Sequence, residues 1–302
     1  MDFRGELFPQ LFTNGVINGS WYGVLGLGFA LILTVTGRFH LAYAVTYTLA
    51  AYVAVALSQD VGIPLGIAFF LAVVVASLSG VMTEGVVYRP LAAGGGGLLG
   101  IFIASLGLTI VAENLIRLTW GAGSASRSLV GFPLRPFTVL GVTFTSLDMA
   151  AVFTAWFLVL ALAFFLSYTP WGRIVNAVRV NPEMARVVGI NTERVHWLVF
   201  AIGSALAGVF AVYAAMRFAA VPDMGLQQTL IAFVVAFMAL GTRPVSVALT
   251  GLALGLVESL SGLFLSAQWA PVVVFGVLFV YLALRPVQLR LALRQVQRLV
   301  TA

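Results

Sequence analysis

Long apolar runs follow one another along most of this 302-residue chain, and they limit the folds that it can adopt. The hydrocarbon core of a bilayer is about 30 Å thick and takes about 20 apolar residues of helix. Charged residues make up only 9% of the chain and hydrophobic residues 61%, whereas an average soluble domain is about 25% charged. Because lipid cannot hydrogen-bond an exposed backbone, the runs are expected to be helices. We therefore predict an all-α polytopic membrane protein.

The apolar runs divide into nine segments, which we assign to a single transmembrane domain over residues 1–302. This fold class has about 8–10 transmembrane segments, some of them broken or re-entrant. The segments are 14–36, 40–57, 62–83, 98–118, 148–167, 196–216, 227–241, 245–266 and 270–284. Only "GTRP" separates the seventh segment from the eighth, so a re-entrant segment is expected there. The start, "MDFRGELFPQLFTNG", lacks a basic region before the first run, so we expect that run to be retained as a span.

Arginines are unevenly distributed between the breaks, and this predicts the orientation in the membrane. If the break around Gly172 is cytoplasmic, alternation places most arginines inside and most aspartates outside, as the positive-inside rule requires. The N-terminus is then outside and the C-terminus is cytoplasmic. The arginines assigned to the inside are Arg38, Arg89, Arg173, Arg179, Arg186, Arg194, Arg243, Arg285, Arg290, Arg294 and Arg298. The outside carries Asp2, Glu6, Asp60, Asp148 and Asp223 with Arg4, Arg127 and Arg135.

Glycines recur four residues apart in two segments. The first stripe is Gly15, Gly19 and Gly23, and the second is Gly251 and Gly255. Such stripes let two helix backbones touch in a bilayer, where lipid gives no hydrophobic drive to association. We predict that the first stripe packs against another helix.

The break "GRIVNAVRVNPEMARVVGIN" (residues 172–191) concentrates charge in an otherwise apolar chain. Asn181, Pro182 and Glu183 form a helix start, since Asn caps free N–H groups, Pro suits the first position and Glu suits the positive end of the dipole. Gly189 is a left-handed helix stop. The enclosed helix, Pro182 to Val188, is too short to be stable alone in water. It is therefore expected to rest on lipid headgroups or to dock into another protein; a loop that only fixes topology is the alternative.

This break resembles the cytoplasmic coupling segment of ABC importer permeases of the branched-chain amino acid type. The resemblance extends along the chain through "NGSWYGVLGLGFALIL", "VYRPL", "SLGLTIVAENLIRLTWG", "GSALAGVFAVYAA", "PDMG", "GLALGLVES" and "LRPVQL". It implies that residues at about 169–195 seat in a groove of a cytoplasmic ATPase subunit. The residues that it implies for this coupling are Gly172, Arg173, Arg179, Asn181, Pro182, Glu183, Met184, Ala185, Arg186, Gly189, Ile190 and Asn191, with Ala185 expected on the contact face.

Two stretches depart from the pattern of that family. The second segment begins "HLAYA" where the family usually shows "NFAHG", and "GTRPVS" replaces a glycine-rich "GGxGS". The resemblance therefore implies a permease but does not identify leucine, isoleucine or valine as its solute.

Several polar side chains within the apolar segments are candidates for a translocation path. Glu258 has no sequence-local partner, and a charge at the bilayer centre costs about 2.5–3.5 kcal/mol on insertion scales, so it should face protein or water. Glu113, beside Asn114, lies four residues before Arg117, and an ion pair on one helix face is the structural alternative. A second set is His40, Tyr43 and Tyr47, which share one face of the second segment. Helix packing is the alternative for this set.

Enzymatic functions are disfavoured by the residue types that the chain lacks. It has no cysteine, and its two histidines, His40 and His196, do not form a metal site. The ATP-binding signature GxxxxGK[ST] requires a lysine, and all 16 basic residues are arginines. No catalytic residue and no cofactor is therefore predicted in this chain. Because the basic residues lie at segment ends, membrane topology explains the charge of +6 without nucleic acid.

We interpret the sequence as the permease subunit of an ATP-driven importer for a small, amino acid-like organic solute in a prokaryotic cell membrane. The resemblance implies two ATPase subunits that bind ATP and magnesium, a second permease that is the same chain or a related one, and an extracytoplasmic solute-binding protein. The alternative is an ion-coupled secondary transporter or channel that uses Glu113 and Glu258. A non-transporting membrane scaffold is a third possibility, and it predicts no continuous polar path.

Overall fold

A computed structural model describes residues 3–120, 127–133, 135–139, 141–239 and 243–284. The α-helices are α1 (Phe3–Thr36), α2 (Tyr43–Val55), α3 (Leu65–Met82), α4 (Arg89–Ala93), α5 (Leu98–Trp120), α6 (Ser146–Tyr168), α7 (Pro170–Val180), α8 (Pro182–Val187), α9 (Thr192–Phe218), α10 (Met224–Ala239) and α11 (Pro244–Ser261), with a further helix at Ala270–Leu284. Two π-helical segments, η1 (Ala56–Asp60) and η2 (Thr83–Tyr88), extend α2 and α3, and η3 (Ala267–Trp269) is a short 3₁₀ helix. Asp2, Arg285, Arg290, Arg294 and Arg298 lie outside the described residues.

Each of the nine predicted segments corresponds to a helix, which confirms an all-α polytopic membrane protein. Six helices are long and apolar enough to cross a membrane. These candidate spans are Leu7–Thr36, Leu65–Ala93, Leu98–Trp120, Ser146–Tyr168, Thr192–Phe218 and Pro244–Ser261. α10 and Ala270–Leu284 are apolar but shorter. At a rise of about 1.5 Å per residue, the 16 residues of α10 span only about 24 Å, less than the hydrocarbon core.

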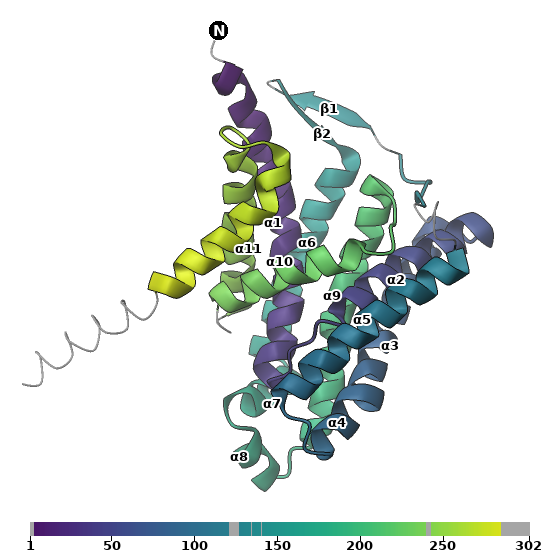
Figure 1. Cartoon of the computed structure of the whole chain (residues 1–302), viewed down its shortest axis with the longest axis vertical. Helices are drawn as coiled ribbons and strands as arrows, with labels where there is room; N and C mark the ends of the chain where they lie inside the picture. The colour runs from purple at the N-terminus through teal and green to yellow at the C-terminus, as the bar shows by residue number, and fades with distance from the viewer. Residues whose placement is uncertain (1–2, 121–126, 134, 140, 240–242, 285–302) are drawn as a thin grey trace, which may run out of the picture.

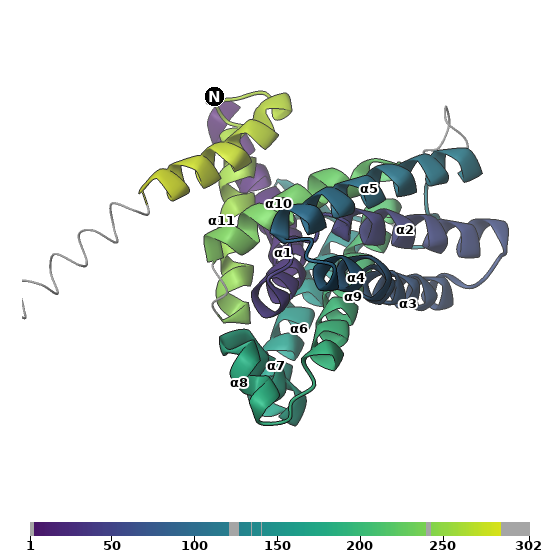
Figure 2. The same ribbon diagram turned by 60° about the horizontal axis from the view of Figure 1, so that its bottom comes forward.

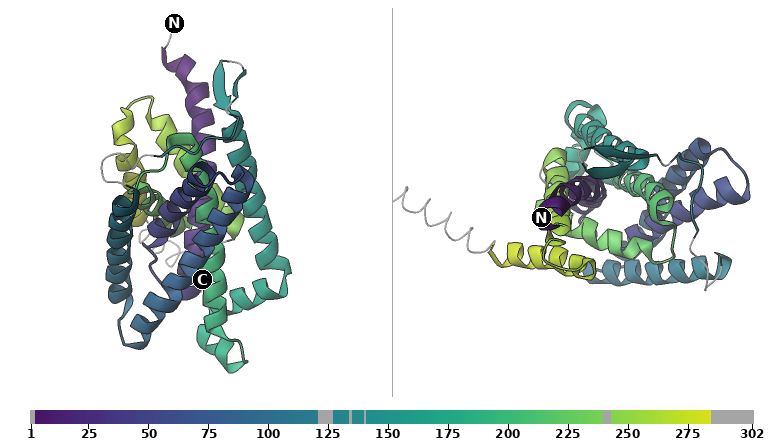
Figure 3. Two further views of the ribbon diagram at one scale, coloured as in Figure 1. Left: turned by 90° about the vertical axis from the view of Figure 1, so that its right-hand side faces the viewer. Right: turned by 90° about the horizontal axis from the view of Figure 1, so that it is seen from above.

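α1 is the central element of the fold. It contacts α6, α9, α10 and α11, and it runs along the longest dimension of the molecule (Figure 1). α7 and α8 lie at the end opposite to the start of α1, as two views agree (Figures 1 and 3). α2, α3 and α5 project together to one side of α1 (Figure 2). The two ends of the molecule therefore differ, and the predicted coupling segment occupies one of them.

The glycine stripe of α1 packs against that of α11, as the sequence predicted. A Cβ atom at Gly19 would lie 2.7 Å from the Cα of Leu252, and one at Gly15 would lie 2.9 Å from the Cα of Leu256. From the other side, a Cβ at Gly255 would overlap the backbone of Gly19. The two backbones touch because neither stripe carries side chains, which is the contact that small residues allow in lipid.

A two-stranded antiparallel hairpin, β1 (Pro136–Val139) and β2 (Val142–Thr145), was not predicted. It lies beside the start of α1 (Figure 1). The side chain of Gln10 pairs with the open edge of β2, since its amide donates to the carbonyl of Thr143 at 2.9 Å and its oxygen accepts from the N–H of Thr143 at 2.8 Å. The side-chain amide thus occupies backbone groups that an edge strand would leave free.

The ion pairs group the charged residues as the topology prediction groups them. Near α7 and α8, Arg89 pairs with Glu193 at 2.8 Å. At the hairpin end, Arg127 binds Asp60 through two hydrogen bonds of 2.5 and 2.7 Å, which hold the pKa of that carboxyl below its usual value. Arg127 and Asp60 were both assigned to the outside, and Glu193, which pairs with Arg89, is adjacent in sequence to Arg194 on the assigned inside.

Candidate coupling segment and translocation path

α7 turns back tightly against the end of α6. The hydroxyl of Thr169 accepts a hydrogen bond from the N–H of Gly172 at 3.0 Å, and Pro170 occupies the first turn. A Cβ at Gly172 would lie 2.6 Å from the Cα of Leu166, and the amide of Asn176 donates to the carbonyl of Leu166 at 2.8 Å. Gly172 is therefore required by the close packing of α7 on α6, a reason that the sequence did not show.

α8 has the start and the stop that the sequence predicted. The Asn181 side chain accepts from the N–H of Met184 at 2.9 Å, with Pro182 and Glu183 in the first turn. Gly189 ends the helix at φ +85°. The N–H of Ile190 returns to the carbonyl of Ala185 at 2.9 Å, which satisfies a helix-end carbonyl. The predicted end at Val188 is one residue beyond the observed one.

The outward surface of α8 is apolar, but Ala185 is not part of it. Ala185 is 3% exposed and packs against its own chain, so the prediction that it lies on the contact face was wrong. It faces inward because it lies on the helix side that packs against the rest of the segment, which the short sequence pattern did not resolve. Met184, Val187 and Val188 are 59%, 81% and 69% exposed. They form the exposed apolar face of α8.

The other predicted coupling residues lie around this face. Arg173, Glu183 and Arg186 are exposed and Arg179 is half-buried. Arg186 donates to the hydroxyl of Thr192 at 3.1 Å, which ties α8 to the start of α9. Asn191 caps α9 by accepting from the N–H of Arg194 at 3.1 Å. These side-chain hydrogen bonds hold the segment against the start of α9.

His40, Tyr43 and Tyr47 are buried inside the chain. His40 is 0% exposed, and its Nδ1 lies 2.9 Å from the hydroxyl of Tyr88. The Tyr43 hydroxyl donates to the carbonyls of Leu25 and Gly203. These contacts join neighbouring helices and agree with helix packing, the alternative interpretation. Tyr47 also lines a cavity, described below, and path roles for all three residues stay predictions.

Glu113 and Asn114 lie on different parts of the α5 surface. Glu113 is half-buried and forms no ion pair with Arg117 within 4.0 Å in the described structure, so the predicted pair is absent. Glu113 is nevertheless within electrostatic range of both Arg117 and Asp223. Asn114 is exposed, and its amide donates to the carbonyl of Ile110 on its own helix at 2.7 Å. Path roles for both residues stay predictions.

Glu258 faces protein, as the cost of a charge in lipid requires. It is partly buried and lies close to the side chain of Tyr22 on α1. Its Oε2 atom is buried without a hydrogen-bond partner among the described atoms. The inter-helix contact is therefore observed, and a role in translocation stays a prediction.

Two charged clusters within the fold were missed by the sequence analysis. Near α7 and α8, Glu84 is 2% exposed, pairs with Arg38 and lies 3.7 Å from Nδ1 of His196. At the hairpin end, Arg217 lies 3.1 Å from Asp148. The pattern Thr145-x-x-Asp148 signals the capping box that the structure contains. No local sequence pattern, however, indicates that Arg217 pairs with Asp148 or that Arg38 pairs with Glu84, because these residues are far apart in the sequence.

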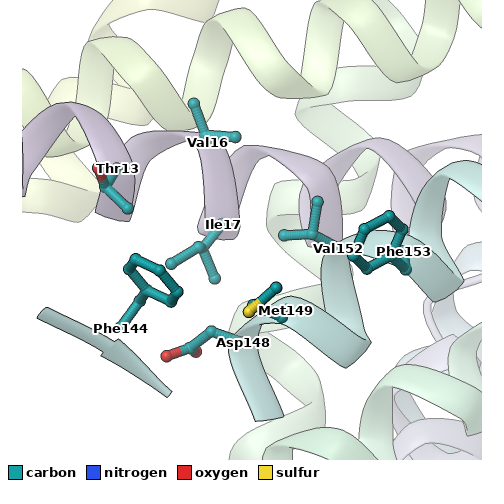
Figure 4. Close-up of a pocket in the computed structure, with 8 residues that line it drawn as sticks. All are labelled: Thr13, Val16, Ile17, Phe144, Asp148, Met149, Val152 and Phe153. Atoms are coloured by element: carbon teal, nitrogen blue, oxygen red, sulfur yellow. The ribbon is translucent and has the colours of Figure 1, made fainter. Parts of the chain in front are cut away.

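Three surface hollows differ in the side chains that line them. One of about 250 Å³ lies between α1 and α6 and is lined mostly by apolar groups, among them Ile17, Phe144 and Phe153 (Figure 4). A second, of about 430 Å³, lies between Arg38 and the glycines 95–97. The third, of about 310 Å³, lies at the junction of α9 and α10 and is lined by Tyr47, Asp223 and two glutamines. We call this third hollow the outer cavity.

Comparisons with known proteins agree with this arrangement. The high-affinity branched-chain amino acid transport system permease protein LivH of Escherichia coli K12 is 30% identical over 296 residues, which cover 92% of this chain and 94% of LivH. The corresponding protein BraD of Pseudomonas aeruginosa is 28% identical over 292 residues, with the same coverage. PsaBC from Streptococcus pneumoniae, solved in complex with a Fab, has a similar fold, with a TM-score of 0.51 and 12% identity over 90% of each chain.

The family model described as "Branched-chain amino acid transport system / permease component" matches residues 11–283. The match includes the described helices from most of α1 to nearly the end of Ala270–Leu284, together with the segment that forms α7 and α8. This chain therefore belongs to the family of permease components of branched-chain amino acid transport systems.

Proposed function

We propose that this permease imports a small amino acid-like solute, driven by two ABC ATPase subunits that dock on α8. The observation that supports this proposal is the exposed apolar face of α8. The helix has only six residues, and both of its ends are capped. Water-exposed apolar side chains on so short a helix are explained by a partner that covers them. A loop that only set topology would need charge but no shaped helix.

The remaining partners follow from the same proposal. Residues 1–302 form one membrane domain with its coupling segment at about 169–195, paired with a second copy or a related permease and served by an extracytoplasmic solute-binding protein. ATP and magnesium are bound by the ATPase subunits, because the chain is a transport subunit without the lysine that a phosphate-binding loop requires. The names of LivH and BraD support an amino acid-like solute.

Reconstituted transport separates an ATP-driven importer from an ion-coupled transporter. The permease, its ATPases and its binding protein are reconstituted in proteoliposomes with ATP on the ATPase side and a labelled branched-chain amino acid outside. We expect uptake that requires both ATP and the binding protein and that persists when ionophores collapse ion gradients. Uptake that continues without ATP and stops with ionophores would establish the ion-coupled alternative.

The membrane orientation is a second part of the proposal that experiment can decide. The grouping of arginines and aspartates at opposite ends motivates an outside N-terminus and a cytoplasmic C-terminus. A phosphatase that is active only outside the cytoplasm is fused after Gly141 in the hairpin, or after Asn181 in the coupling segment. We expect activity from the first fusion and none from the second. The opposite pattern would invert the topology.

A further inference from the structure

The outer cavity is formed where α9 ends and α10 begins, at the end of the molecule that carries the hairpin. Its polar lining consists of Tyr47, Asp223, Gln227 and Gln228, and its apolar lining includes Phe218 and Met224. Its volume of about 310 Å³ is at the lower end of the range for small-molecule sites. The cavity thus has the size and the mixed lining of a site for a compact solute.

The polar lining offers a carboxylate and a buried amide oxygen without a partner. The Asp223 side chain is exposed and makes no ion pair within the described chain. The Oε1 atom of Gln228 is buried and has no hydrogen-bond partner among the described atoms. Buried polar atoms are almost always paired in proteins, so this acceptor lacks a donor that a bound solute would supply.

The arginine nearest to the cavity is already engaged by aromatic rings and a carboxylate. The guanidinium of Arg217 lies 5.0 Å from the ring centre of Phe218 and 5.6 Å from that of Trp21, and it is 3.1 Å from Asp148. Arg117 is within electrostatic range of Glu113, which also interacts with Asp223. None of the residues that line the cavity is cationic.

The backbone at the cavity wall is strained. Ala219 lines the cavity with φ +71° and ψ +153°, and it is the non-glycine residue with positive φ in the described chain. Its neighbour Ala220 is held by two backbone hydrogen bonds to Arg127, of 2.8 and 2.9 Å. Such strain persists only where surrounding contacts impose it, and it concentrates at functional sites.

We propose that the outer cavity is a binding site for solutes that carry an ammonium group beside a small apolar body. The carboxylate of Asp223 and the carbonyl oxygen of Gln228 receive the ammonium, and Phe218 and Met224 contact the apolar body. The assignment of this site to transport rests on the proposed function, whereas ammonium binding itself does not. The site would admit solute from outside to the permease.

Because the chain has no cysteine, ligand binding at this site can be measured through a single introduced thiol. Gln227 is exposed in the cavity lining, so Gln227→Cys places the chain's single thiol there. Its alkylation by a membrane-impermeant maleimide is timed in right-side-out vesicles that contain the whole transporter complex. The probes are L-leucine, isoamylamine, which lacks the carboxylate, and 4-methylpentanoate, which lacks the ammonium. Ser128→Cys, at another exposed position of the same end, is the matched control.

We expect leucine and isoamylamine to slow alkylation of Gln227→Cys and 4-methylpentanoate to have no effect. Adding Asp223→Asn should weaken the protection at least about tenfold, because a hydrogen bond to a charged group is lost, and Asp223→Glu should restore most of it. Alkylation of Ser128→Cys should not respond to any probe. Because Asp223 is exposed, neither substitution should perturb folding, and an unchanged rate of alkylation without probe verifies this.

The proposal is overturned if no probe protects, if 4-methylpentanoate protects as well as isoamylamine, or if Asp223→Asn leaves protection unchanged. Alkylation is read without ATP and is independent of uptake. Protection by the amine without ATP-driven uptake would therefore contradict the proposed function and retain the site, whereas normal uptake by Asp223→Asn together with lost protection would retain the binding site and contradict its role in transport.

Discussion

Replacing Gly255 by leucine is expected to prevent accumulation of the folded permease. A Cβ atom at this position already overlaps the backbone of Gly19, and the larger side chain must separate α1 from α11. Overpacking a dense interior costs about 1–3 kcal/mol and occasionally more; we expect the upper part of this range or beyond, because backbone rather than a flexible side chain blocks the space. Gly255→Ala should show a smaller loss of the same kind.

Membrane level and the thermal aggregation midpoint of the detergent-solubilised protein measure this effect. Gly107→Leu is the matched control, because it makes the same change in a membrane helix where a Cβ meets nothing within 4 Å. We expect near-normal levels for Gly107→Leu. If Gly255→Leu accumulates and melts like the control, the tight crossing of α1 and α11 does not stabilise the fold.

Charging the exposed face of α8 should abolish uptake without preventing folding. Met184 and Val187 are 59% and 81% exposed, so Met184→Glu with Val187→Glu changes the free energy of unfolding little, as for most surface positions. Docked against an ATPase, the same carboxylates would be desolvated without partners, which costs several kcal/mol. We expect normal membrane level, loss of co-purifying ATPase and loss of uptake.

Val139→Glu, an equally drastic change at an exposed position in the hairpin, is the control and should retain ATPase. Gly189→Val tests the direction of α8, because a β-branched residue is strained at φ +85°. It should also insert normally and lose coupling. If ATPase recovery and uptake match the parent for both coupling variants, α8 is not the docking helix.

Structural features that depend only on neighbouring residues were predicted correctly from the sequence. Asn181, Pro182 and Gly189 define α8 because caps and stops act within a few residues. The apolar segments became helices because a lone backbone in lipid has no other hydrogen-bond partner. The glycine stripe of α1 predicted a close helix contact because its spacing is itself the contact surface.

The identity of contacting partners was decided only by tertiary structure. The sequence did not show that Gly19 meets α11, that Ala185 faces inward or that Glu84 binds Arg38, because each depends on how distant helices are placed in space. The outer cavity has the same origin, since Tyr47 and Gln228 are far apart in sequence and meet only through the packing of α2 and α10. Sequence periodicity determined which residues form helices and which helix faces are polar or small. Long-range packing then determined which faces meet, because lipid surrounds every apolar helix alike and leaves shape and a few polar contacts to select the partner.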